Sequence, residues 1–574
     1  MTYQIQANGK PVYLHSRYDP LEEAERWAEM QTLPLRSVIL FLGWGMGYQV
    51  LEWCKQHSGT ACSMILWEPE PQFFVQSLPH VDLQPLRNID NLEIVLGYDE
   101  QSLFQALHRN LSFLLNHELT IKPLPFVNIY PPVIVQTLKK QVQMVVALKQ
   151  NALQYMETMG QACQSHIIGN LKQVPNCLLP HNVQQITTGR PGIIVAAGPS
   201  LNKNIQYLHA AQNKSVIFAV DTSFPVLRHH GIKPDFVVSK DPSDLNLKHF
   251  QNLQQVADTI LAFEPQVHPE IPKKFDGKKI WIPARTNQVH QWLKGFQLQA
   301  GDHFPFSTNV ALAAFNLAVV MGCNPIIFVG LDLCFSNGDG TSHVEHSALN
   351  ARTWFVPQTQ QLIYQREQFQ ESVQGISVEG IDGKQYPAIP NFFEALRLLE
   401  SLIPRQRSLV IDATEGGAKI AGTTILSLQE ALRQYCQQDI SLTEVLSGIK
   451  PQCDHKQIQE ALNAIAELLV QCRELADQAL EQFEEKENKS SLFKELSTIR
   501  KKIEQHDKIY HVLENALERL IVEIDRPEFW SETSVPQAEL VLHYHWYFTQ
   551  IKRACELYAP QYSQSACEMA NSGI

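Results

Sequence analysis

The chain has 574 residues, of which 44% are hydrophobic, 9% aromatic and only 18% charged. This length predicts several domains with packed cores, and the low charge argues against long disordered tails. The net charge of −12 argues against nucleic acid as the main partner. The eleven cysteines include no Cys-x-x-Cys pair, which argues against a zinc ribbon and indicates reduced thiols.

The N-terminal segment MTYQIQANGKPVYLHSRYDP lacks the apolar core of a signal peptide. No window of about 18 consecutive apolar residues predicts a membrane-spanning helix. We therefore expect a cytoplasmic protein of bacterial type without a membrane span. The sequence leaves its oligomeric state open.

Residues 1–130 alternate apolar strands with helical patterns, which predicts an N-terminal Rossmann-like α/β domain. A glycine-rich turn at 43–47 (GWGMG) follows one strand, and Glu68 ends the next. This spacing resembles the S-adenosylmethionine methyltransferase fingerprint, in which the acid binds the ribose hydroxyls. The alternative is a β–α corner without a ligand. Because no later methyltransferase signature follows, we expect S-adenosylmethionine to bind poorly or not at all.

The rest of the chain divides by composition into three further segments. Residues 131–173 have helical spacing and predict connecting helices, either one long helix or two. Residues 174–435 return to strand and helix alternation and predict a central Rossmann-like α/β domain. Residues 436–574 are nearly free of Gly and Pro, which predicts a C-terminal all-α helical domain with one long antiparallel pair.

The segment 192–204, GIIVAAGPSLNKN, predicts a strand, a glycine turn and a helix start. Gly198 allows a tight turn, and Pro199 suits the first position of a helix. The N–H groups of Ser200 and Leu201 would then receive an anion at the helix N-terminus. We expect a phosphate-bearing ligand here, and a packing role for the glycine is the alternative.

Polar residues follow several other predicted strands of the central domain. Open α/β sheets bind ligands at the carboxyl ends of their strands, although each such residue is also a common cap or turn residue. Together with the turn, they form one candidate ligand-binding set: Ala197, Gly198, Pro199, Ser200, Leu201, Asp221, Thr222, Asp241, Ser307, Thr308, Asn309 and Gly330.

The loop 338–347, GDGTSHVEHS, follows the strand that ends at Asp332. A histidine suits a general base at neutral pH, so the candidate catalytic residues are His343, His346 and Asp332. We favour His343 over His346 because it lies nearer to the strand end. The alternatives are a solvated loop and a metal site that includes Glu345, for which no fourth ligand is evident.

Five segments carry a resemblance to one family: AAGPSL (196–201), VDTSFPVL (220–227), GIKPDFVVSKDP (231–242), GLDL (330–333) and ATEGGAKIAGT (413–423). With them the chain resembles the motility accessory factors (Maf), which are flagellin glycosyltransferases with a central domain of the hydroxymethylpterin diphosphokinase type. The central domain is also similar to bacterial sialyltransferases, although Asn309 replaces the glycine that usually follows the Ser/Thr pair.

The resemblance implies transfer of a pseudaminic or legionaminic type of nonulosonic acid from a CMP-activated donor to Ser or Thr hydroxyls of flagellin, in flagellum assembly and motility. The candidate ligand-binding set would then bind the nucleotide sugar, and Arg285 and Lys240 are candidate partners of its carboxylate or phosphate. We expect no cofactor and no metal, because the chain has no Asp-x-Asp pair to clamp a diphosphate. The alternatives are a pterin diphosphokinase-like transferase that uses ATP and Mg²⁺, and a non-catalytic flagellin chaperone or export factor.

Overall fold

The fold is that of a computed structural model. It describes residues 2–7, 10–31, 37–57, 63–89, 91–251, 256–282, 304–305, 307–336, 340–359, 361–366, 369–451, 454–485, 489–506, 508–513, 516–517, 520, 530 and 537–572. The chain divides into two compact units, Met1–Gln154 and Tyr155–Ile574. Within the described part of the chain, no helix has the length and apolar character needed to cross a membrane.

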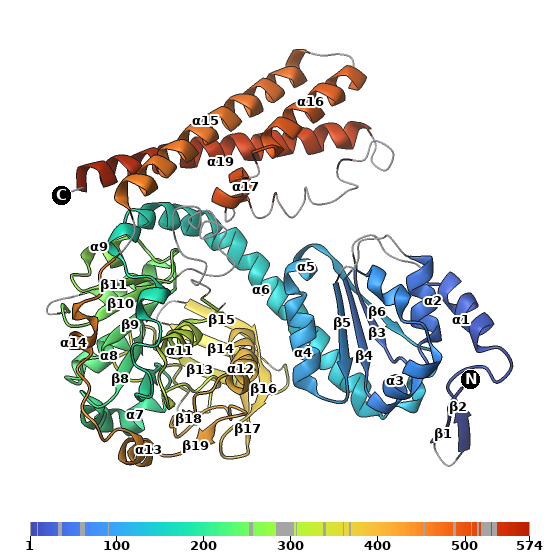
Figure 1. Ribbon diagram of the computed structural model, residues 1–574, viewed down its shortest axis with the longest axis horizontal. Coiled ribbons are helices and arrows are strands. Elements are labelled where there is room, and N and C mark those ends of the chain that lie inside the picture. Colours follow the sequence, from blue (N-terminus) through green and yellow to red (C-terminus); the bar gives the residue numbers. More distant parts are fainter. Residues whose placement is uncertain are drawn as a thin grey trace. The chain divides into compact units, whose positions relative to one another are not determined.

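The first unit contains a parallel four-stranded sheet in the order β5-β4-β3-β6 (Figure 1). Its strands are β3 (Ser37–Leu42), β4 (Ser63–Glu68), β5 (Asn91–Leu96) and β6 (Glu118–Pro123), preceded by a hairpin of β1 (Gln4–Ala7) and β2 (Lys10–Tyr13). Its helices are α1 (Pro20–Glu29), α2 (Tyr48–Gln56), α3 (Pro71–Ser77), α4 (Glu100–Arg109) and α5 (Leu111–Asn116). The two central strands are fully buried, as parallel strands covered on both faces should be.

The second unit is organised by a parallel eight-stranded sheet in the order β11-β10-β9-β8-β7-β12-β18-β19. Its strands are β7 (Gly192–Val195), β8 (Val216–Val220), β9 (Phe236–Ser239), β10 (Ile260–Phe263), β11 (Lys279–Trp281), β12 (Ile326–Val329), β18 (Val410–Asp412) and β19 (Thr424–Ile425). Strand β7 pairs with β8 on one side and with β12 on the other, so the strand order reverses at β7. Short apolar runs in the sequence predict all of these strands except β19: GIIVAAG, SVIFAVD, FVVSKD, TILAF, KKIWIP, NPIIFVGLDL and SLVIDAT.

Several helices connect the strands of this sheet or follow its last strand. They are α7 (Leu201–Asn204), α8 (Phe224–His229), α9 (Glu270–Lys274), α11 (Val310–Met321), α12 (Pro390–Leu402), α13 (Leu428–Tyr435) and α14 (Leu442–Ser447). Helix α11 is almost entirely apolar and buried, begins after the cap Asn309 and ends at Gly322 with φ 83°. The left-handed backbone at that end favours glycine.

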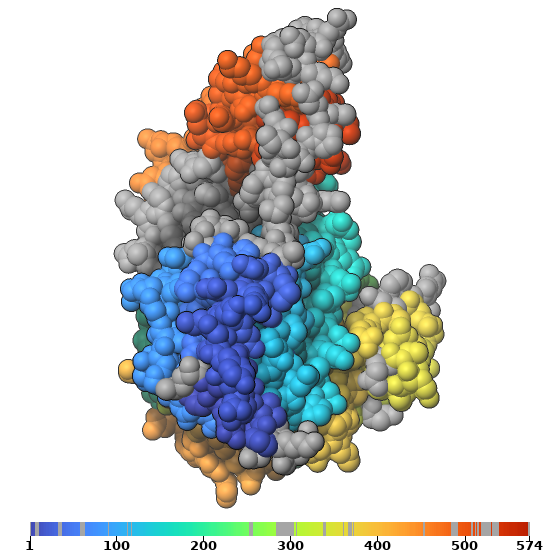
Figure 2. Space-filling model, turned by 90° about the vertical axis from the view of Figure 1, so that its right-hand side faces the viewer, coloured from blue at the N-terminus to red at the C-terminus, as the bar shows by residue number. Residues whose placement is uncertain are grey.

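A set of antiparallel strands lies between β12 and α12. It comprises β13 (Arg352–Val356), β14 (Gln361–Arg366) and β15 (Phe369–Gln374) in one sheet, and the hairpin β16 (Ile376–Glu379) and β17 (Gln385–Ala388). The sequence analysis did not predict these strands. The first sheet reaches the surface of the molecule, where it is yellow in Figure 2.

The connecting segment is one long helix, α6 (Pro132–Leu171), and the point of division between the units lies within it. The C-terminal region contains α15 (His455–Glu485), α16 (Lys489–Glu504), α17 (Lys508–Val512) and α19 (Gln537–Ser572). Helices α15 and α19 run antiparallel side by side (Figure 1). One apolar cluster extends from the eight-stranded sheet to these helices. The α/β class with a C-terminal helical region is confirmed, whereas the boundaries at 130, 173 and 435 stay predictions.

Candidate functional site

At the strand reversal, the turn after β7 lies against the turn after β12. The N–H of Ala196 donates to the carbonyl of Val329 at 2.9 Å, and the N–H of Gly198 donates to that of Gly330 at 2.8 Å. In open α/β sheets, ligands bind outside the strand ends at such a reversal. The structure therefore brings together the candidates of the first turn with Gly330 and Asp332.

The anion at the first turn is the side chain of Asp332. Its Oδ2 accepts the N–H of Ser200 at 3.1 Å, and its Oδ1 accepts the Ser200 hydroxyl. The N–H of Leu201 donates to the carbonyl of Gly198 at 3.1 Å. The Ser200 and Leu201 N–H groups thus both have partners within the chain, and a ligand anion at this turn stays a prediction. Helix α7 begins at Leu201, so Pro199 precedes the cap instead of occupying the first helical position.

Asp332 is enclosed by glycine backbone and by the core of the sheet. Burial raises its pKa to about 6, and the Ser200 hydrogen bonds oppose that rise. A Cβ at Gly198 would meet the Asp332 carboxyl and would lie 2.6 Å from the Gly330 carbonyl oxygen. A Cβ at Gly417 would lie 2.5 Å from the Asp332 Cα. Gly198 thus provides close packing, and Asp332 fixes the two turns to each other.

A second polar group occupies the carboxyl ends of β8 and β9. Asp221 is buried, and its Oδ1 accepts the N–H of Thr222 at 2.8 Å. Its Oδ2 accepts the hydroxyl of Ser239 at 3.3 Å. Burial, and then the charge of Asp241, raise the pKa of Asp221 to about 7. Asp241 itself is exposed, so this pair offers one buried and one accessible carboxyl.

Glu264 joins this group at the end of β10 and was not among the predicted residues. It is buried, and its Oε1 accepts the Ser307 hydroxyl at 2.7 Å. Its Oε2 pairs with the Lys240 ammonium at 2.6 Å. Lys240 is thus held by a carboxylate, which argues against the phosphate contact expected for it. Glu264 directly follows the predicted strand, so the strand-end rule used for Asp221 also applies to it.

The remaining residues predicted beside Ser307 lie at the start of α11. The Asn309 side chain caps that helix by accepting the N–H of Leu312 at 2.9 Å. Thr308 is half-buried next to it. Asn309 therefore has the structural role that was left open as the alternative. Arg285, the other predicted phosphate partner, lies outside the described residues.

The histidine loop rests on the turn after β7. The N–H of Val344 donates to the carbonyl of Ala197 at 2.9 Å, and the Val344 side chain is buried in the core. His343 is half-buried, with its Nδ1 2.8 Å from the Ser342 hydroxyl oxygen and its N–H donating to Asn350 Oδ1 at 3.3 Å. The loop thus holds His343 next to the strand reversal.

His346 has a different environment. It is exposed, it has a φ of 65°, and its ring centroid lies 4.4 Å from that of His229. The part of the chain that the structure describes contains no group of three His, Cys, Asp or Glu side chains arranged to hold a metal ion. The alternative of a metal site at His343, Glu345 and His346 is therefore not supported by their placement.

The glycine-rich turn of the first unit is closed around Glu68. This buried carboxylate accepts the N–H groups of Trp44 at 2.7 Å and Gly45 at 3.2 Å, and both its oxygens lie 2.9 Å from the Tyr130 hydroxyl. Burial raises the pKa of Glu68. The acid that would bind ribose hydroxyls in a methyltransferase therefore binds the turn of its own domain.

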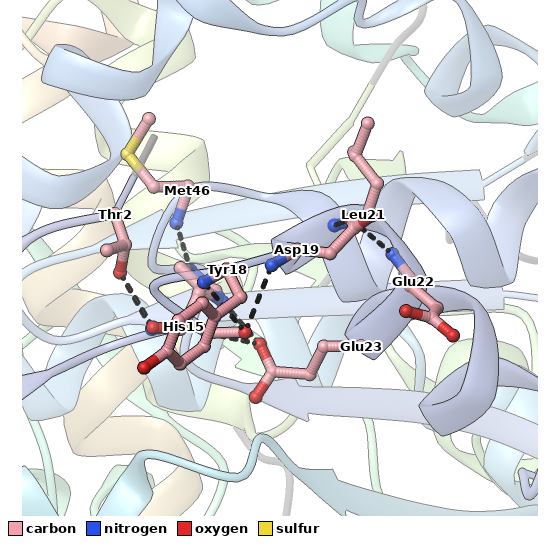
Figure 3. A network of polar contacts seen from close by, with 9 residues as sticks. Thr2, His15, Tyr18, Asp19, Leu21, Glu22, Glu23 and Met46 are labelled. Atoms are coloured by element: carbon pink, nitrogen blue, oxygen red, sulfur yellow. Dashed lines mark hydrogen bonds and ion pairs between the residues drawn. The ribbon is translucent and has the colours of Figure 1, made fainter.

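Side chains fill the space in front of this turn. A Cβ at Gly45 would lie 2.7 Å from the Phe126 ring and 2.8 Å from His15 Nε2. His15 Nε2 also accepts the N–H of Met46 at 3.0 Å, and Thr2 donates to the His15 carbonyl (Figure 3). Burial lowers the pKa of His15 to about 4, so the ring is neutral at pH 7. The arrangement is that of a closed β–α corner.

The two sheets belong to the Rossmann-like class of α/β proteins. Comparisons with known proteins identify more specific families within that class. Residues 9–145 match a family described as "Glycosyltransferase Maf N-terminal domain". Residues 165–338 match a family described as "6-hydroxymethylpterin diphosphokinase MptE-like". The chain thus combines a match to the Maf glycosyltransferase N-terminal domain in its first unit with a match to the MptE-like family in its second unit.

A solved structure and a curated relative are also similar to the chain. The Maf glycosyltransferase structure from Magnetospirillum magneticum AMB-1 has a TM-score of 0.53, 14% identity, and a match covering 100% of this chain and 95% of that one. At that identity the likeness concerns the fold alone. An uncharacterized protein of Treponema pallidum (strain Nichols) is 46% identical over 57 residues, which are 10% of this chain and 27% of that protein.

Proposed function

We propose that the chain transfers a nonulosonic acid, of the pseudaminic or legionaminic type, from a CMP-activated donor to Ser or Thr hydroxyls of flagellin. One observation carries this proposal. The hydrogen bond from Val344 to Ala197 holds His343 directly beside the strand reversal, where a Rossmann-like sheet binds its nucleotide. The match of residues 9–145 to the Maf glycosyltransferase N-terminal domain supports the reaction class and a flagellin-related acceptor.

In this reaction the acceptor hydroxyl oxygen attacks the anomeric carbon of the sugar. The bond from that carbon to the phosphate oxygen breaks, and CMP departs with the electron pair. His343 takes the hydroxyl proton as the general base. Proton transfer of this kind contributes about a hundred- to ten-thousand-fold to the rate.

The remaining candidates divide into positioning residues and donor contacts. Asp332 and Ser200 position the two turns and do not touch the reacting atoms, because their polar atoms are bonded to each other. Thr222 and Asp241 reach the surface at the strand ends and are the donor contacts we propose, whereas the Thr308 hydroxyl is buried at the start of α11. A donor with one phosphate needs no metal clamp, which agrees with the lack of an Asp-x-Asp pair.

The decisive experiment is co-expression of the chain with flagellin in a host that makes the activated sugar. We expect the intact mass of flagellin to increase by one or more nonulosonic acid residues. The matched control is His343→Ala in the same host, which should leave flagellin unmodified while the variant remains folded. An unchanged flagellin mass with the wild-type chain would contradict the proposal.

The MptE-like match favours a second candidate, a diphosphokinase acting on a pterin with ATP and Mg²⁺. The two functions differ in their nucleotide. If ATP with Mg²⁺ raises the melting temperature and CMP does not, the diphosphokinase is favoured. The reverse result favours the transferase, and a chain stabilised by neither nucleotide would favour a chaperone or export factor.

A further inference from the structure

The histidine loop is also an extension of the antiparallel sheet β13–β14–β15. The N–H of Ser342 donates to the Ala351 carbonyl at 2.9 Å, and that of Thr353 donates to the Gly340 carbonyl at 2.5 Å. Thr341 forms a bridge with Arg352. Residues 340–342 therefore lie along β13 as a short additional strand, immediately before His343.

The two faces of this sheet differ in exposure. Side chains alternate between the faces along each strand, and cross-strand partners share a face. Thr353 and Leu362 are buried on the inner face. The register places the following residues on the outer face: Arg352, Trp354, Val356, Gln361, Ile363, Gln365, Gln370, Ser372 and Gln374. Thr341 shares this face through its bridge to Arg352.

The outer face has a distinct chemistry. The described residues of this face include no carboxylate and one cation, Arg352, so they lack the several cations that a nucleic acid requires. Trp354, at the centre of this face, is 41% exposed. Its neighbours include glutamines, whose amides both donate and accept hydrogen bonds as a peptide backbone does. An exposed tryptophan among neutral polar groups is typical of the central anchor of a protein interface.

We propose that this outer face binds the polypeptide acceptor and presents its hydroxyl to His343. This inference rests on the proposed transferase function. Neighbouring strands lie about 4.8 Å apart, so a short acceptor segment anchored on Trp354 reaches the extension at 340–342. Because the sheet continues directly into the loop that carries His343, the polypeptide acceptor, and not the nucleotide, binds this face.

The test measures binding of unmodified flagellin to the full-length chain, together with the KM for flagellin in the transfer assay. The variant Trp354→Ala should weaken both by about ten-fold or more, and Trp354→Phe should restore part of the loss. The matched control is Tyr18→Ala, which removes an aromatic side chain that is 98% exposed in the first unit. The control should bind flagellin like the wild type.

The rise in melting temperature caused by CMP checks that each variant is folded and that its donor site is intact. It should be the same in Trp354→Ala and in the wild type. Unchanged flagellin binding in Trp354→Ala, or no flagellin binding by the wild type, would overturn the inference. A loss of the CMP effect would also overturn it by making this face part of the donor site. If the wild type binds flagellin through Trp354 but transfers no sugar, the proposed function fails and the docking surface stands.

Discussion

The carboxylate of Asp332 accepts both the backbone N–H and the hydroxyl of Ser200, across 132 positions of sequence. The turn that was expected to bind a ligand phosphate thus already binds a carboxylate of the same chain. A donor nucleotide would have to bind over this pair, at the exposed ends of the neighbouring strands. Burial of the Asp332 carboxyl, which the Ser200 hydrogen bonds oppose only in part, raises its pKa to about 6.

The first prediction concerns the pH dependence that follows from this pKa. Because Asp332 has a pKa of about 6 in the folded chain and an ordinary value of 3.8, its ionisation lowers the free energy of unfolding as pH rises through this interval. Asp332→Asn keeps an acceptor for Ser200 and does not titrate. From pH 4 to pH 7, the difference in free energy of unfolding should therefore shift in favour of the variant, by up to about 3 kcal/mol. Urea unfolding at four pH values measures this shift, and parallel pH profiles would contradict it.

The second prediction concerns Gly198. A methyl group there would collide with the Asp332 carboxyl and the Gly330 carbonyl, so Gly198→Ala should destabilise the second unit by about 1–3 kcal/mol or more. The matched control is Gly448→Ala, since a Cβ at Gly448 meets no atom within 4 Å and its φ is −88°. Thermal unfolding distinguishes them, and equal melting temperatures would show that the turn has room.

The third prediction is that S-adenosylmethionine does not bind the first unit. Glu68 is occupied by its own turn, and Phe126 and His15 fill the space in front of Gly45. Isothermal titration calorimetry should therefore detect no heat of binding at micromolar ligand. A micromolar dissociation constant would show that these side chains move aside.

The fourth prediction separates the two histidines. His343→Ala should reduce sugar transfer by about a hundred- to ten-thousand-fold, because it removes the proposed base. His346→Ala should have a much smaller effect, because its exposed ring lies against His229. Flagellin modification and CMP-induced stabilisation are measured for both variants. Full activity of His343→Ala with loss in His346→Ala would reassign the base.

The fifth prediction concerns metal. Sugar transfer should continue in EDTA, because a CMP leaving group carries one phosphate and the chain has no Asp-x-Asp pair. The assay compares initial rates before and after chelation. Complete loss of activity that Mg²⁺ or Mn²⁺ restores would refute metal-independent transfer and favour the diphosphokinase chemistry.

Much of the fold could be predicted from local sequence. Buried parallel strands such as β7 and β8 are short apolar runs between turn residues, and they were found. The antiparallel sheet was missed because its outer face is rich in glutamine, so its apolar alternation is weak. The helical character of α6 was visible because the segment after Pro132 has no further proline and its apolar residues recur at helical spacing, although one helix could not be told from two.

The candidate site was less accessible from sequence. The strand-end rule found Asp221, Asp241 and Asp332, and it would have found Glu264 had it been applied to β10. The rule could not show which polar atoms pair with one another. The hydrogen bonds of Ser200 to Asp332 join the turns after two strands that are distant in sequence. These hydrogen bonds therefore depend on the three-dimensional fold. For that reason, the sequence could not show that a carboxylate of the same chain binds at the predicted anion site.

The central position of β7 also has a consequence for synthesis of the chain. Its partner β12 follows more than a hundred residues later, so one hydrogen-bonding edge of β7 has no native partner while the ribosome translates the intervening segment. At about 5–20 residues per second, this interval lasts on the order of ten seconds. The apolar strand Gly192–Val195 is therefore exposed to non-native pairing on the nascent chain, and chaperone binding during translation should concentrate on this interval.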